Sequence, residues 1–198
     1  MLNRGFYIRD ADTIAKDLLG KLLVHRTDKG IVSGMIVEVE AYMGAEDAAS
    51  HAYRNLRTSR TEVMYSQGGY AYVYLIYGMY NCLNIVANAV DRPEAVLIRA
   101  LQPVEGIELM KANRKAGEKS KLSSLCSGPG KLCMAMGIDR SQNGADLTRD
   151  TLCIENYMRV EKEEIASSPR INIDYAGKAR DYLLRHFLKD NLYLSKKG

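Results

Sequence analysis

The sequence has few residues that could build a metal site. Its four cysteines, Cys82, Cys126, Cys133 and Cys153, form no Cys-x-x-Cys pair, and none of the three histidines is placed to complete a zinc site with them. We therefore expect no structural metal and no cofactor. Because the chain carries no recognisable secretion signal, we expect reduced thiols, buried in part as small hydrophobic side chains.

Long hydrophobic runs are also lacking. No apolar segment approaches the length of a membrane span, and residues 1–4 lead into a polar segment rather than into the core of a signal peptide. We expect a soluble protein of the cytoplasm. A length of 198 residues with 46% hydrophobic and 26% charged content predicts a single globular domain, residues 1–198, that buries its own core.

The charge of the chain is only modestly unbalanced, at +4, but the basic residues are clustered. The stretch 111–140 holds seven basic residues against two acidic ones, and Arg54, Arg57 and Arg60 recur at every third position. Such clusters are compatible with a solvated surface and with contact to a polyanion.

Hydrophobic periodicity and turn residues predict an α+β fold, with a curved, mainly antiparallel and partly open barrel-like sheet, peripheral helices and a protruding β-hairpin. Strands are expected at Leu22–Thr27, Gly34–Tyr42, Tyr70–Leu75, Asn81–Ala87, Ala95–Leu101, near Leu152 and at Arg170–Asp174. Helices are expected at Asp10–Gly20, Glu105–Lys115, from Ser127 through Met136 and at Lys178–Leu188.

Tyrosine is concentrated in the middle of the chain, where six of the thirteen lie between Tyr65 and Tyr80. Strand alternation places Tyr70, Tyr72 and Tyr74 on one face. The pair Tyr77-Gly78 is typical of a hairpin turn, so Tyr77 is expected to be exposed at the tip. The tyrosines could be sheet core or a stacking platform for bases.

Glu40 and Arg99 occupy strand positions that the pattern would otherwise give to apolar side chains, and Arg99 in particular needs a charged partner there. His51 follows a stretch of small residues. Each has an ordinary structural explanation: strand glutamates usually face water, and a lone histidine is often a hydrogen-bonded structural residue.

Together, however, these residue types meet the needs of hydrolysis at a nucleobase that has been turned out of a duplex. Unstacking the base costs a few kcal/mol, which an aromatic wedge and a pocket of stacking rings can offset. A carboxylate such as Glu40 can deprotonate a water and stabilise positive charge near C1′. A neighbouring arginine such as Arg99 can hold that water and keep the carboxylate ionised.

At these residues the chain resembles the alkyladenine (3-methyladenine) DNA glycosylases of animals and bacteria. The similarity keeps its order and approximate spacing over most of residues 10–188. The segments that carry it are Val37–His51, Tyr72–Asn84, Val96–Pro103 and Leu125–Cys133. The segment Ile85–Arg92 differs from the animal pattern in length and composition.

The resemblance implies a role for nine residues. The catalytic glutamate falls on Glu40, and the arginine that positions the water falls on Arg99. The base-binding residues are Tyr42, His51 and Tyr74, which stack on the base, Asn84, which discriminates against the amino group of guanine, and Ile171, whose carbonyl would contact the water. The DNA-intercalating tyrosine falls on Tyr77, with Met79 beside it.

The implied activity is that of a monofunctional, monomeric glycosylase, which flips alkylated purines out of double-stranded DNA and hydrolyses the N-glycosidic bond to leave an abasic site in base excision repair. Its substrates would be 3-methyladenine, 7-methylguanine and hypoxanthine. No lysine occurs between Lys29 and Lys111, so this segment has no amine for lyase chemistry. A non-catalytic nucleic-acid-binding module and an RNA- or nucleoside-processing hydrolase remain alternatives.

Overall fold

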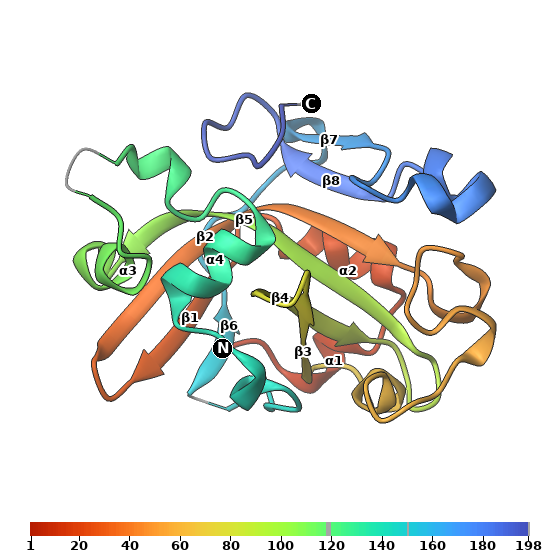
Figure 1. Cartoon of the computed structure of the whole chain (residues 1–198). Helices are drawn as coiled ribbons and strands as arrows, with labels where there is room; N and C mark the ends of the chain where they lie inside the picture. Colours follow the sequence, from red (N-terminus) through yellow and green to blue (C-terminus); the bar gives the residue numbers. More distant parts are fainter. Residues whose placement is uncertain (118–119, 150, 198) are drawn as a thin grey trace.

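An antiparallel sheet organises the protein in the computed structural model, which describes residues 1–117, 120–149 and 151–197 (Figure 1). Six of its eight strands follow the order β3-β4-β5-β2-β1-β6, while β8 pairs with β2 and β7 pairs with β8. The strands are β1 (Leu22–Thr27), β2 (Gly30–Tyr42), β3 (Ala71–Ile76), β4 (Tyr80–Ala87), β5 (Glu94–Glu105), β6 (Leu152–Glu155), β7 (Ile165–Ser168) and β8 (Arg185–Leu188).

Short helices surround this sheet. The α-helices are α1 (Arg4–Tyr7), α2 (Ala11–Leu18), α3 (Ile107–Asn113) and α4 (Pro129–Met136). The 3-10 segments are Gly44–Glu46, Tyr53–Asn55, Glu62–Tyr65, Leu122–Ser124, Arg140–Gln142, Lys162–Glu164 and Asp174–Asp181. In Figure 1, α4 lies in front of the long strands and α2 behind them. The curled antiparallel sheet with few helices confirms the predicted α+β fold.

Strand β2 is the longest and carries the centre of the sheet. It pairs with β5 on one side and, on the other, with β1 in its first half and β8 in its second. Residues Glu38 to Glu40 therefore have a strand on both sides. Register shifts around Glu38 mark a bulge, which increases local twist and bends the sheet.

The sequence of α2 accounts for where the helix begins, which face it buries and where it ends. The carboxylate of Asp10 accepts a hydrogen bond from the backbone N–H of Thr13 at 2.9 Å, which caps the first turn. Four residues at helical spacing, Ala11, Ile14, Ala15 and Leu18, are buried. The helix was expected at Asp10–Gly20, and Gly20, with φ +80°, lies just beyond its end.

The strand alternation of the tyrosine-rich segment is also confirmed. Ala71 and Val73 belong to the main core, whereas Tyr72 belongs to a second apolar cluster against which Tyr70 and Tyr74 pack. All four cysteines are buried and free. In the part of the chain that the structure describes, no helix is long and apolar enough to cross a membrane.

Two of the predicted elements near the carboxyl end are wrong. The strand expected at Arg170–Asp174 is absent because Asn172 has φ +59°, and Ile173 leads directly into a 3-10 segment. The helix expected at Lys178–Leu188 is replaced by the end of that 3-10 segment and by β8, whose residues Arg185–Leu188 are all buried between β2 and β7. Strand pairing therefore overrides local helix propensity here.

Candidate active site

A cavity of about 700 Å³ opens between the β3–β4 hairpin, the start of α4 and the loop at 171–175. Seven of the nine residues expected at the site line this cavity: Tyr42, His51, Tyr74, Tyr77, Asn84, Arg99 and Ile171. Glu40 and Met79 are not among its lining residues, although Glu40 is hydrogen-bonded to two residues that are.

Glu40 is completely buried at the second half of β2. Its Oε1 accepts a hydrogen bond from the backbone N–H of Ile171 at 2.7 Å, and its Oε2 accepts one from the hydroxyl of Tyr42 at 2.9 Å. The Nη1 of Arg99 lies 3.3 Å from the same Oε2. Because each carboxylate oxygen offers two lone pairs, these contacts leave Oε1 free to accept one more hydrogen.

Ile171 makes a contact with Glu40 that the sequence did not predict. Its backbone N–H donates to the carboxylate, whereas the contact expected of its carbonyl was with the attacking water. This donor helps to solvate a buried negative charge, which would otherwise be costly.

Arg99 finds the charged partner that its strand position required. Its Nε donates to Glu38 Oε1 at 3.1 Å, and its Nη1 faces Glu40. Burial opposes the charge of the guanidinium, but the two glutamates outweigh burial and raise the pKa of Arg99. Glu38 was missed in the sequence, although it shares a strand face with Glu40 and was available as the partner of Arg99.

The ring of Tyr42 packs against Arg170, which forms a buried ion pair with Asp47 that the sequence did not reveal. The guanidinium of Arg170 lies 4.7 Å from the centre of the Tyr42 ring. Both of its terminal nitrogens donate to Asp47, at 2.5 and 2.8 Å, and Nη1 also donates to the carbonyl of Ala41. Burial, followed by the charge of Glu40, raises the pKa of Tyr42, so its hydroxyl keeps the proton that it donates.

Burial and a neighbouring arginine keep His51 uncharged. Its Nδ1 lies 2.9 Å from the hydroxyl of Tyr72, and its Nε2 lies 3.4 Å from Nη2 of Arg60. Since arginine can only donate, Nε2 accepts and the ring proton lies on Nδ1. Burial first, and the charge of Arg60 second, lower the pKa of His51 to about 4. The ring therefore carries no charge at neutral pH.

The rings of Tyr72 and Tyr74 pack next to His51. Its ring centre lies 4.6 Å from that of Tyr74 in an edge-to-face arrangement, and the rings of Tyr72 and Tyr74 are 5.4 Å apart. Arg60 lies over Tyr74, 5.0 Å from the ring centre. Asn84 is buried nearby, and its amide nitrogen donates to the carbonyl of Tyr72 at 3.1 Å. The cavity thus combines aromatic faces with a polar side chain, Asn84, that can contact the edge of a base.

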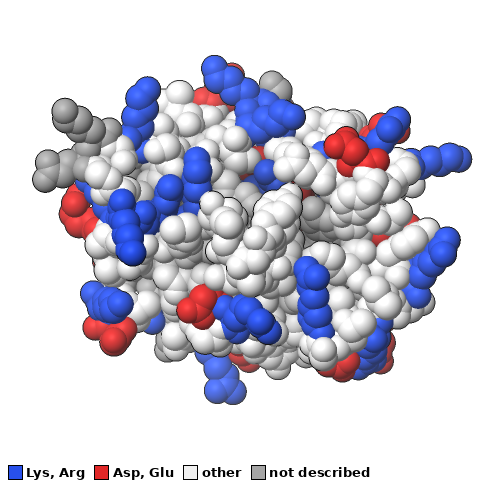
Figure 2. Space-filling view, viewed as in Figure 1, with Lys and Arg blue, Asp and Glu red and all other residues white. Residues whose placement is uncertain are grey.

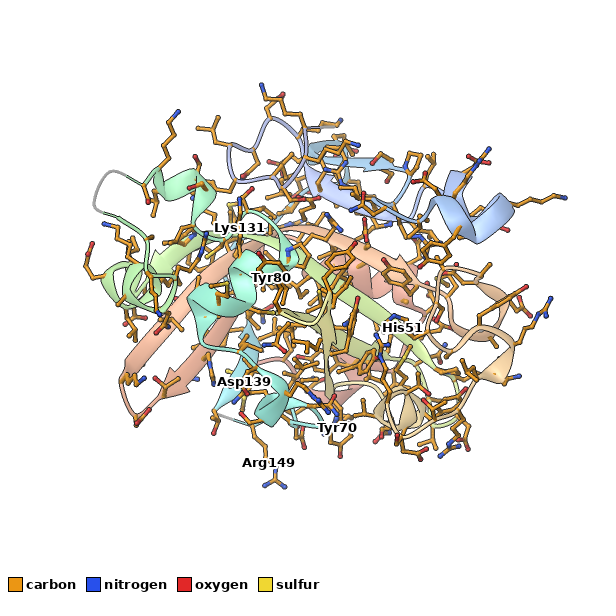
Figure 3. The ribbon with its side chains drawn as sticks, in the orientation of Figure 1. His51, Tyr70, Tyr80, Lys131, Asp139 and Arg149 are labelled. Carbon is orange, nitrogen blue, oxygen red and sulfur yellow. The ribbon has the colours of Figure 1, made fainter. Side chains whose placement is uncertain are left out.

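The tip of the β3–β4 hairpin stands out from the cavity. Tyr77 is 75% exposed and Met79 is 66% exposed. Tyr77 and Gly78 both have positive φ, 53° and 70°, as in the tight turns that join twisted strands. Next to the tip, Tyr80 packs closely on the start of α4, because a Cβ at Gly130 would lie 3.1 Å from its ring. Figure 3 shows Tyr80 beside α4 and His51 on the other side of the hairpin.

Basic side chains gather around this face. In Figure 2, Lys and Arg side chains cluster over the region of α3 and α4, while the centre of the face is largely uncharged. Arg114 and Lys131 line the cavity. Arg57, by contrast, is already engaged by Glu62 and Asp91 at 2.6 and 2.9 Å. Within residues 1–117, 120–149 and 151–197, no group of three or more His, Cys, Asp or Glu residues could hold a metal ion.

Comparison with known proteins adds to this geometry. The family model described as methylpurine-DNA glycosylase matches residues 5–192. A protein of Clostridium novyi (strain NT), named "putative 3-methyladenine DNA glycosylase", is 51% identical over 201 residues, covering 99% of this chain and 98% of its own length. Proteins of the same name from Clostridium perfringens (strain 13 / Type A) and Bacillus cereus (strain G9842) are 46% and 49% identical, each covering 98% or more of both chains.

Proposed function

Because the chain belongs to the methylpurine-DNA glycosylase family, we propose that it removes 3-methyladenine, 7-methylguanine and hypoxanthine from double-stranded DNA by base flipping. It is a DNA glycosylase, a hydrolase that acts on N-glycosyl bonds. Within that activity, the single observation that best supports our proposal is the buried Glu40, hydrogen-bonded beside a cavity with aromatic walls. We also propose that the enzyme acts in the cytoplasm. We propose that it is a monomer, since one flipped base needs one cavity.

In the proposed reaction, Glu40 is the general base. A water that donates to the free lone pair of Oε1 loses a proton to the carboxylate as its oxygen bonds to C1′. The N-glycosidic bond breaks, and its electron pair leaves with the purine. A cationic 3-methyladenine or 7-methylguanine base becomes neutral as it leaves, whereas hypoxanthine must also receive a proton. The Nη1 of Arg99, 3.3 Å from Oε2 of Glu40, is the charged neighbour of the carboxylate that takes the proton.

The flipped base would lie among Tyr42, His51 and Tyr74, which line the cavity together. Stacking on aromatic rings is worth about 1–3 kcal/mol per base, enough to offset much of the cost of unstacking. A cationic purine is favoured on the face of a tyrosine. The uncharged ring of His51 adds no repulsion against such a base.

The experiment that tests this function uses two duplexes, one treated with a methylating agent and one containing a single hypoxanthine. The wild-type chain should release free methylated purine or hypoxanthine and leave abasic sites that break only after alkali. Release from free nucleosides but not from duplex DNA would contradict the proposal and support a nucleoside hydrolase. Binding without release would support the non-catalytic alternative.

Tyr77 is predicted to fill the gap that the flipped base leaves in the duplex. Replacing Tyr77 by serine should weaken flipping on the order of tenfold or more, because a ring worth about 1–3 kcal/mol of stacking is lost. The measurement is the fluorescence change of a reporter base opposite or beside the lesion. Thermal stability should not change, because the ring is 75% exposed.

A matched control is Tyr157→Ser, at a tyrosine that is 55% exposed and lines a different cavity, formed with residues of α2. This variant should flip bases as the wild type does. Equal losses in both variants, or a lower melting temperature for Tyr77→Ser, would contradict the role of Tyr77 as a wedge.

A further inference from the structure

Glu38 is a second fully buried carboxylate on β2, two residues before Glu40. Its Oε1 accepts hydrogen bonds from Nε of Arg99 at 3.1 Å, Nε of Arg185 at 2.8 Å and the hydroxyl of Ser195 at 2.8 Å. Its Oε2 accepts one from the backbone N–H of Ser195 at 2.6 Å. A buried charge is tolerated when it is both paired and hydrogen-bonded, and Glu38 meets both conditions.

These contacts determine how Arg99 is oriented. Its guanidinium is planar, with donors in a fixed geometry. Glu38 accepts from Nε, and the hydroxyl of Ser195 accepts from Nη2 at 3.3 Å. Two contacts at different nitrogens fix both the position and the rotation of the plane. The remaining terminal nitrogen, Nη1, is thereby directed at Oε2 of Glu40, 3.3 Å away.

Ser195 belongs to a carboxyl-terminal segment that is itself anchored near the cavity. The hydroxyl of Ser127, which lines the cavity, donates to the carbonyl of Leu194 at 3.0 Å. The Nη2 of Arg185 donates to the carbonyl of Lys196. Tyr193 and Leu194 pack against the main hydrophobic core. These contacts hold Ser195 against both Glu38 and Arg99.

We propose, on the basis of the function inferred above, that Glu38 and Ser195 are positioning residues that hold Arg99 in the orientation needed by Glu40. The segment Tyr193–Lys196 is then part of the active site, although neither of these residues contacts the base. Weakening this support should slow bond cleavage and leave DNA binding intact, because neither Glu38 nor Ser195 lines the cavity.

The decisive variants are at Ser195, where the change is small. Ser195→Ala removes the hydroxyl that bridges Glu38 and Arg99 but keeps the backbone N–H on Glu38. Ser195→Thr keeps both and is the matched control. We expect the single-turnover excision rate of hypoxanthine to fall about tenfold in the alanine variant, with Kd for lesion DNA within about twofold of wild type. The threonine variant should stay close to wild type.

A purely structural role for Ser195 would give a different pattern, with a lower melting temperature but unchanged excision below it. That result would overturn the proposal, and so would equal losses in the alanine and threonine variants. Glu38→Gln should give a larger rate loss, but it also leaves Arg185 with a weaker partner and so tests folding as well.

A second readout does not depend on activity. The Nε–H of Arg99 should give a slowly exchanging signal in a ¹⁵N NMR spectrum, assigned by its loss in Arg99→Lys. Ser195→Ala should speed its exchange with solvent, and Ser195→Thr should not. If the wild type excised no base, the proposed function would fail, while the positioning of Arg99 would still be decided by this signal. Unchanged exchange in the alanine variant would overturn it.

Discussion

Replacing Glu40 by glutamine should lower the single-turnover rate of base excision about 100-fold or more, with little effect on binding to lesion DNA. The amide keeps the size of the side chain, but it lacks the negative charge and the basic oxygen that the attacking water needs. Arg99, which lies 3.3 Å from Oε2 of Glu40, would keep Glu38 as its counterion, so the fold should tolerate the change.

The control is Glu46→Gln, an exposed glutamate six residues further along the chain. This variant should excise bases at the wild-type rate. Rates are measured with enzyme in excess over a duplex that contains one hypoxanthine, and binding by titration of the same duplex. Wild-type excision by Glu40→Gln would exclude the general-base role, and an equal loss in binding would indicate that the pocket itself had collapsed.

Replacing Asp47 by asparagine should lower the free energy of unfolding by about 3–5 kcal/mol, because it leaves a buried guanidinium without its counterion. The side chains of Arg170 and Asp47 are 0% and 1% exposed, and Arg170 makes two of its hydrogen bonds to this carboxylate. Burial disfavours the charge on Arg170, but Asp47 outweighs it and raises the pKa of the guanidinium. Denaturant titration at neutral pH measures the loss.

Glu62→Gln provides the matched control, because Glu62 also pairs with an arginine, Arg57, but at the surface. Exposed ion pairs contribute about 0–1 kcal/mol, so this variant should lose little. Similar losses in the two variants would contradict the argument from burial. Asp47→Asn should also weaken binding of the flipped base, since Arg170 supports the ring of Tyr42.

The elements that follow from local pattern were predicted well. The cap at Asp10, the alternation around Tyr72 and the turn at Tyr77-Gly78 depend on neighbouring residues alone, and the structure confirms them. The carboxyl-terminal region was predicted poorly. Strand β8 forms because β2 and β7 offer it hydrogen bonds on both edges, and β7 was not predicted at all.

At the site too, residues with a local signal were predicted and residues with remote partners were not. Glu40 and Arg99 stood out as charges at buried strand positions, and the family resemblance suggested their roles. Glu38, Asp47, Arg170 and Ser195 did not stand out, because their partners are remote in sequence. The hydrogen bonds joining Asp47 to Arg170 and Glu38 to Ser195 span 123 and 157 residues. No local pattern reveals such pairs.

The large separation in sequence between Glu38 and Ser195 affects when their hydrogen bonds can form during synthesis of the chain. The turn that ends β3 can form while the chain is still being synthesised, but the bonds from Ser195 to Glu38 cannot. At about 5–20 residues per second, Ser195 is added roughly 8–30 s after Glu38. Contacts of such high contact order also form slowly. The contacts of Ser195 with Glu38 and Arg99 therefore become possible only after every residue that lines the cavity has been synthesised.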